Sequence, residues 1–264
     1  MLTSLSGQMT KRINDLTSYS EDIGNIFSSI FFNFEALIMT HMFSNADHLD
    51  CLAPTSIVDS THPDVVAFAR SHSTGTTFLS KAVSLYYAVR DEIRYDAYDL
   101  DLTARGLSAS RAIETRGGWW VSKAVLVAGC CRALDIPAAL GYADVKNHLS
   151  TERLRQAMGT DIFYWHGYTA IWLNDVWVKA TPAFNVELCE KFRIRPLEFD
   201  GTSDSIYHSL DMDGRQHMEY LKYKGEYSDV PIEKIVEDFK ELYPNFRDLK
   251  DKDFDQEVDD EVSL

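Results

Sequence analysis

Two positions far apart in the chain have the surroundings that acid–base or nucleophilic chemistry requires, but only one of them holds a residue of suitable type. His166 stands at the head of a β-prone run, directly before Gly167. The pair Gly117-Gly118 precedes a predicted helix that begins at Trp120 or at the next residue. A cysteine at such a helix N-terminus has a lowered pKa and a larger thiolate fraction. In this chain the position holds Trp120, and an indole has one N–H donor and no nucleophilic lone pair.

Two predicted elements position these residues. Apolar residues recur with helical spacing after Trp120, and the helix is expected to end before Pro137, since proline disfavours helix in the residue that precedes it. Two aromatic-rich, β-prone runs flank the polar turn Asn174-Asp175. This pattern predicts a hairpin whose first strand opens with His166 and whose second strand closes with Thr181.

The remaining patterns predict an α+β fold, in which helices pack against an antiparallel sheet. A turn-rich connector with Pro54 and Pro63 is expected to precede this core. The segment after Asn185 is expected to form short helices or loops. Further helices are predicted at residues 76–93, 108–116 and 232–242, and strands at residues 94–96 and 138–145.

Five segments carry a resemblance to a known superfamily. They are Arg116-Gly117-Gly118, Lys123-Ala124, residues 132–137, residues 144–148 and residues 166–185. On these segments the chain resembles, over about residues 80–220, the transglutaminase-like superfamily, whose core is related to papain-like cysteine proteases. More narrowly, it resembles the bacterial transglutaminase-like domain proteins. The resemblance implies the same core fold.

The resemblance also implies where a catalytic triad would lie. In that family a Cys-His-Asp triad makes and breaks acyl bonds through a thioester. Carried onto this chain, the nucleophile falls on Trp120, the base on His166, and the third member on Thr181, just before Pro182. The chain therefore keeps the histidine and lacks the other two members. Thiol acyl transfer at Trp120 is not possible.

Each candidate site residue has a functional and a purely structural interpretation. His166 is either a general acid or base, as its type suits near neutral pH, or a relic histidine inside a filled pocket. Trp119 and Trp120 either line a ligand pocket, as aromatic residues often do, or Trp120 plugs the former cleft and contributes packing only. The set of expected pocket-lining residues is Trp119, Trp120, Tyr168, Thr181 and His148.

Other chemistry is disfavoured. Ser122 and Lys123 do not share the direction of Trp120, because a helix turns about 100° per residue. Thr181 could orient His166 through its hydroxyl, but it cannot stabilise an imidazolium as a carboxylate does. His208 and His217 lack ligand spacing with an acidic partner, so no metal and no cofactor are expected.

Charge and cysteine usage limit the partners and the setting. The formal net charge of −15 argues against nucleic-acid or anionic-membrane partners, which need a basic surface. The four cysteines show no metal or disulfide spacing, which predicts buried thiols and a reducing, cytoplasmic setting. The apolar stretch from Ile23 to Phe43 contains Asn33 and Glu35, so we expect an amphipathic helix and no transmembrane span.

The predicted organisation has three parts: an N-terminal helical extension at residues 1–50, a transglutaminase-like domain at 51–248, and an acidic disordered tail at 249–264. Three functional hypotheses remain. The first is a pseudoenzyme, that is, a binding or regulatory module that takes a small molecule or peptide in the cleft. The second is a repurposed enzyme, in which His166 transfers protons during a cyclisation or elimination. The third is that Trp120 is a recent substitution, since tryptophan and cysteine codons differ at one base.

Overall fold

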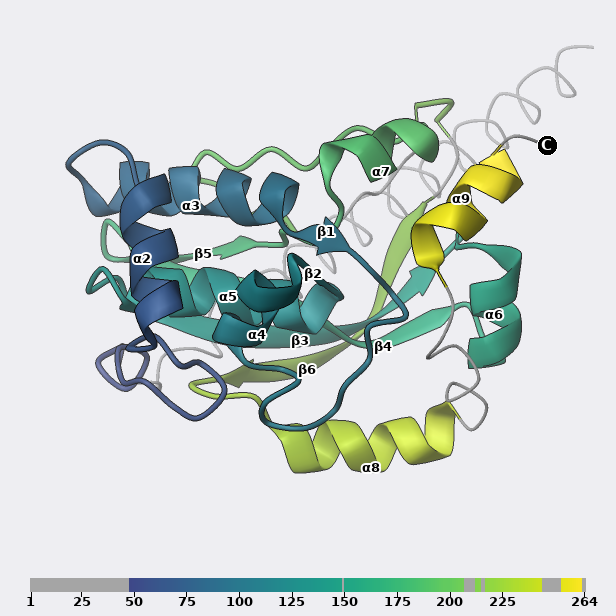
Figure 1. Ribbon diagram of the computed structural model, residues 1–264, viewed down its shortest axis with the longest axis horizontal. Coiled ribbons are helices and arrows are strands. Elements are labelled where there is room, and N and C mark those ends of the chain that lie inside the picture. The colour runs from purple at the N-terminus through teal and green to yellow at the C-terminus, as the bar shows by residue number, and fades with distance from the viewer. Residues whose placement is uncertain (1–47, 149, 207–211, 215–216, 244–252, 263–264) are drawn as a thin grey trace, which may run out of the picture. The chain divides into compact units, whose positions relative to one another are not determined.

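A four-stranded antiparallel sheet with strand order β5-β4-β3-β6 supports the candidate site (Figure 1). In the computed structural model, the described residues are 48–148, 150–206, 212–214, 217–243 and 253–262. The strands of this sheet are β3 (Ala138–Asn147), β4 (Ile162–Leu173), β5 (Val176–Ala180) and β6 (Met218–Tyr227). Two very short strands, β1 (Arg94–Tyr95) and β2 (Gly117–Gly118), pair in parallel.

Helix α5 (Trp120–Arg132) is the central element of the core, and each of its residues is buried. It packs against β4, where Thr169 donates a hydrogen bond from its hydroxyl to the carbonyl of Ala124 at 2.8 Å. Gly167 makes this approach possible, because a Cβ atom there would lie 3.2 Å from the Trp120 carbonyl oxygen. The helix and the strand that carry Trp120 and His166 are thereby held face to face.

The β4–β5 hairpin has the predicted turn. Asn174 and Asp175 both have positive φ, 50° and 64°, as the two central residues of a type I′ turn require. The predicted strand at 138–145 is β3, and the predicted helices at 76–93, 108–116 and 232–242 are confirmed. Their observed bounds are α3 (Phe78–Glu92), α4 (Ala109–Thr115) and α8 (Ile232–Leu242).

The structure differs from the elements predicted from the sequence in three places. The connector contains a helix, α2 (Pro63–His72), which has proline at its first position and is capped by the His62 side chain. The segment after Asn185 contains the long strand β6 as well as the short helix α7 (Val186–Lys191). Part of the tail that was expected to be disordered forms helix α9 (Phe254–Val262). A further short helix, α6 (Glu152–Met158), lies between β3 and β4.

The C-terminal helix belongs to the same compact unit as the sheet. This unit comprises Asp47–Leu264, and within it α9 lies beside α6 and α7 (Figure 1). The predicted N-terminal helical extension and the apolar stretch from Ile23 to Phe43 lie outside the described residues. Among the helices that the structure describes, none is both long enough and apolar enough to cross a bilayer.

Candidate active site

The structure brings Trp120 and His166 together. Their rings are stacked, with centroids 5.6 Å apart and an interplanar angle of 19°. The indole also stacks on Phe163, at 4.9 Å and 16°, and contacts the edge of Trp119 at 5.0 Å. The first side chain of α5 thus lies directly against the histidine at the head of the hairpin, in the middle of an aromatic cluster.

A strained residue just before the histidine fixes this arrangement. Trp165 has a φ of 55°, in the left-handed region that a bulky residue rarely adopts. The strain coincides with a bulge in the β3–β4 pairing, between Ala143 and Val145. Two hydrogen bonds hold the peptide: the Trp165 N–H donates to Asp144 at 3.2 Å, and the indole Nε1 of Trp120 donates to the Trp165 carbonyl at 3.0 Å.

His166 is sealed from solvent. The residue is 1% exposed, and neither ring nitrogen has a hydrogen-bond partner among the residues that the structure describes. Burial lowers the pKa of His166 to about 3, and the nearby charge of His217 contributes in the same direction. The imidazole is therefore neutral near pH 7 and has no contact through which a proton could leave or arrive.

Thr181 does not orient His166. Its backbone N–H donates to the Ser205 carbonyl at 2.8 Å, and its own carbonyl accepts a hydrogen bond from the Tyr86 hydroxyl at 3.1 Å. Its side-chain hydroxyl is buried without a hydrogen-bond partner in the described part of the chain. The expected weak support of the imidazole through this hydroxyl is absent from the described geometry.

Two other predicted site residues point elsewhere. The hydroxyl of Tyr168 donates to the carboxylate of Glu226 at 2.7 Å. The side chain of His148 lies 3.9 Å from the carboxylate of Glu219, at the β3–β6 edge of the sheet. Trp119 is 1% exposed and packs between Trp120 and Phe239. The tryptophan pair is thus near His166, whereas Tyr168 and His148 interact with residues of β6.

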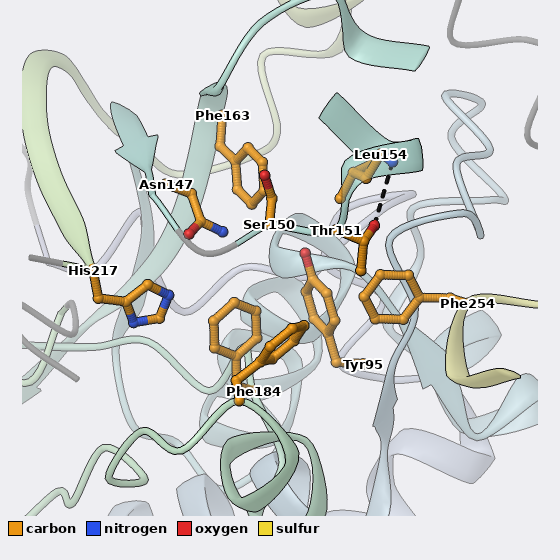
Figure 2. A pocket seen from close by; sticks show the side chains of 10 residues that line it. Tyr95, Asn147, Ser150, Thr151, Leu154, Phe163, Phe184, His217 and Phe254 are labelled. Carbon is orange, nitrogen blue, oxygen red and sulfur yellow. Dashed lines mark hydrogen bonds between the residues drawn. The ribbon is translucent and has the colours of Figure 1, made fainter. Parts of the chain in front are cut away.

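A small cavity lies next to this cluster (Figure 2). Its free volume is about 10 Å³, roughly what one water molecule needs. Buried hydroxyls of Tyr95 and Ser150 face no hydrogen-bond partner among the described residues. The lining residues are Tyr95, Asn147, Ser150, Thr151, Leu154, Phe163, Phe184, Phe192, His217 and Phe254. None of the five expected pocket-lining residues is among them.

Two of the cavity residues that the sequence analysis missed lie at elements that it misread. His217 immediately precedes β6, and Phe254 opens α9. The run from Met218 to Tyr223 contains apolar and aromatic residues but does not alternate strictly, so only the observed pairing of β6 with β3 places His217 near β3. Phe254 and Val258, four residues apart in an acidic run, form one apolar helical stripe.

None of the four cysteines, all of which lie in the described part of the chain, offers an exposed replacement nucleophile. All four cysteines are buried and free of disulfides. Burial raises the pKa of Cys130, and raises that of Cys131 and of Cys189 to about 12, so these thiols do not ionise near neutral pH. The described residues also contain no group of three or more potential metal ligands. His208, one of the histidines considered for a metal, lies outside the described residues.

The side chains of Ser122 and Lys123 donate hydrogen bonds to backbone carbonyls. The Ser122 hydroxyl donates to the Trp119 carbonyl at 3.1 Å. The Lys123 amine is completely buried and donates to the carbonyls of Arg90, at 3.0 Å, and Ile93, at 2.5 Å, at the C-terminal end of α3. Burial lowers the pKa of Lys123 to about 7. Both groups are engaged away from His166.

Comparison with known proteins agrees with the fold. Residues 66–182 match the family model of the transglutaminase-like superfamily core, and this range includes Trp120, His166 and Thr181. No curated protein matches the chain. One similar solved structure is described as a "putative cysteine protease" from Cytophaga hutchinsonii, with 14% identity and a TM-score of 0.40. The alignment covers 69% of this chain and 55% of that one. Residues 66–182 therefore resemble the transglutaminase-like superfamily, and the structure there is a mixture of helices and antiparallel sheet.

Proposed function

We propose that this chain is a binding or regulatory module built on a transglutaminase-like domain, and that it performs no thiol acyl transfer. The observation that carries the proposal is the stack of Trp120 on His166. An indole cannot attack an acyl carbon as a thiolate does. Its ring also fills the space beside the imidazole, where an acyl group would have to sit.

The cysteines support the same proposal. A substitute thiol would need exposure and a lowered pKa. Cys51, Cys130, Cys131 and Cys189 are all buried, and the nearest in sequence to Trp120 lie at the opposite end of α5. Four free thiols also suit a reducing setting, which is why we propose that the protein is cytoplasmic.

The repurposed-enzyme alternative receives less support. A general base must lie within hydrogen-bond reach of the proton that it removes, and its pKa should be close to the working pH. His166 has a pKa of about 3 and is 1% exposed. The imidazole of His166 is stacked on the indole of Trp120. A substrate would have to displace this indole before any proton transfer could occur.

The proposal is tested by an acyl-transfer assay with a glutamine-containing peptide as acyl donor and a fluorescent primary amine as acceptor. The wild-type protein is expected to give no product above the level of the His166→Ala variant. The same protein should also fail to deamidate the glutamine, because hydrolysis at that side chain needs the same γ-glutamyl acyl-enzyme. Product formed by wild type but not by His166→Ala would overturn the proposal, because it would show acyl transfer that depends on His166.

A second variant tests whether the substitution of Trp120 is recent. Trp120→Cys places a thiol at the N-terminus of α5, next to His166. If Trp120 arose recently in an otherwise competent site, this one change should restore turnover. We expect no turnover, because Thr181 provides no carboxylate to stabilise the imidazolium. Rapid turnover by Trp120→Cys would show that the site is a working triad with one changed residue.

A further inference from the structure

The acidic C-terminal helix α9 lies in a formed site on the domain. It carries Asp255, Glu257, Asp259, Asp260 and Glu261 within nine residues, and such a run would be expected to stay in solvent. The structure instead seats it against α6, α7 and the β1 region (Figure 1). Specific contacts must therefore hold this acidic helix on the domain.

The most informative contact is a buried carboxylate. Glu257 is 5% exposed and accepts hydrogen bonds from the hydroxyls of Tyr98, at 2.7 Å, and Thr151, at 2.6 Å. Its second oxygen lies 3.2 Å from a guanidinium nitrogen of Arg153. A buried charge is costly unless it is paired and hydrogen-bonded, and here the domain supplies two donors and a cation. These groups form a receptor for one carboxylate.

An aromatic anchor precedes this carboxylate by one helical turn. Phe254 is 4% exposed, and its ring meets the edges of Tyr95, at 5.7 Å, and Tyr98, at 5.3 Å. In Figure 2 it enters the cavity from the side of Tyr95 and Thr151. Val258 is fully buried on the same face. Aromatic anchors in desolvated pockets are the contacts that dominate binding energy at interfaces.

Basic residues surround these anchors. Arg94 pairs with Asp255 at 2.8 Å, and Lys191 pairs with Asp259. Both cations are partly exposed, so each pair adds little affinity. Complementary charge at an interface rim instead selects the partner and speeds its association.

We propose that Tyr95, Tyr98, Thr151 and Arg153 form a recognition site for acidic helical segments that carry an aromatic residue and, three positions later, a glutamate. Helix α9 fills this site in cis, and a segment of the same pattern from a partner protein exchanges with it. Such exchange removes Phe254 from the wall of the cavity. The inference rests on the proposed binding function and names its partner class.

The experiment measures whether the site binds the helix in trans. A fluorescein-labelled peptide of residues 253–262 is titrated, by fluorescence anisotropy, with the full-length chain carrying Phe254→Ala and Glu257→Gln. These changes release α9 and leave the site intact. The peptide is expected to bind this double variant at least ten-fold more tightly than the wild-type chain, in which α9 competes. A peptide with Glu257→Gln should bind the double variant at least ten-fold more weakly.

The matched control is Asp260→Asn, which removes a charge from an exposed position of the same helix whose carboxylate accepts a hydrogen bond from Gln256. This variant should behave as wild type. Amide hydrogen exchange checks the release: α9 should exchange faster in the double variant and keep its protection in Asp260→Asn. The inference is overturned if the peptide fails to bind the folded double variant, if both peptides bind equally, or if α9 keeps its protection there. None of these results alters the expected absence of acyl transfer, so the two proposals fail separately.

Discussion

The indole of Trp120 lies nearly parallel to the imidazole of His166, with ring centroids 5.6 Å apart. The indole N–H of Trp120 also donates a hydrogen bond to the carbonyl of Trp165, whose backbone has a positive φ of 55°. One side chain thus both covers the histidine and holds the strained peptide in front of it. The predictions below follow from this coupling and from the buried charges around it.

The stability of the protein should fall in acid because of His166. Its pKa is about 3 in the folded state and ordinarily 6.5, so its contribution to stability is complete above pH 6.5 and is lost as the pH falls towards 3. The expected loss is about 1.4 kcal/mol per pH unit within that window. Urea unfolding of wild type and His166→Phe at pH 7, 5.5 and 4.5 measures it. The unfolding free energy of wild type should fall relative to that of His166→Phe as the pH falls, and a constant difference would refute the assignment.

Loss of the Trp120 hydrogen bond should destabilise the fold even when the aromatic stack is kept. Trp120→Phe retains a ring against His166 but leaves the Trp165 carbonyl without its donor, at a cost of about 1–3 kcal/mol. Trp120→Ala also opens a cavity, and should cost about 3–5 kcal/mol. Chemical unfolding gives both values. Equal stability of wild type and Trp120→Phe would show that the hydrogen bond is unimportant.

The buried amine of Lys123 should make stability depend on pH in a second range, on the alkaline side. Its pKa is about 7 in the folded state against an ordinary 10.5, so the unfolded chain binds more protons between these values. Stability should therefore rise as the pH increases from 7 to 9, relative to a Lys123→Met variant that does not titrate. Unfolding free energies of the two proteins at pH 7, 8 and 9 provide the comparison. A difference that stays flat across this range would mean that the amine keeps its ordinary pKa.

Gly141 should not tolerate a side chain. A Cβ atom there would lie 2.1 Å from the ring of Tyr168, which cannot retreat easily because it is buried and bonded to Glu226. Gly141→Ala is expected to cost about 1–3 kcal/mol of unfolding free energy. Gly117→Ala is the matched control, since its nearest neighbours would be 3.7 Å away, at ordinary contact distance. A loss of the same size in both variants would indicate a general cost of removing glycine.

Much of the fold followed from local patterns. Helical apolar spacing and the stop before Pro137 predicted α5, and the polar pair Asn174-Asp175 predicted the hairpin turn. The strand β6 was missed because its residues from Met218 to Tyr223 do not alternate strictly between apolar and polar types. Helix α9 was misjudged because composition alone favoured solvent, while its stability comes from tertiary contacts of Phe254 and Glu257.

The candidate site was predictable only in part. The resemblance placed Trp120 and His166 at one site, and the two rings do meet. That the imidazole has no hydrogen-bond partner among the described residues depends on side-chain directions that a linear sequence does not carry. The left-handed backbone at Trp165 is likewise invisible in sequence, since no glycine marks it. The Tyr98–Glu257 contact joins residues 159 positions apart, which no local pattern could indicate.

The most direct test of the central claim is an NMR titration of the His166 ring with isotope-labelled histidine, in wild type and Trp120→Ala. In wild type the His166 signals are expected to show no protonation between pH 8 and 5, because the ring is sealed and its pKa is about 3. In Trp120→Ala, if the variant stays folded, water reaches the ring and the pKa should rise towards 6.5. A wild-type His166 that titrates near neutral pH would contradict the account, because the imidazole would then be available for catalysis.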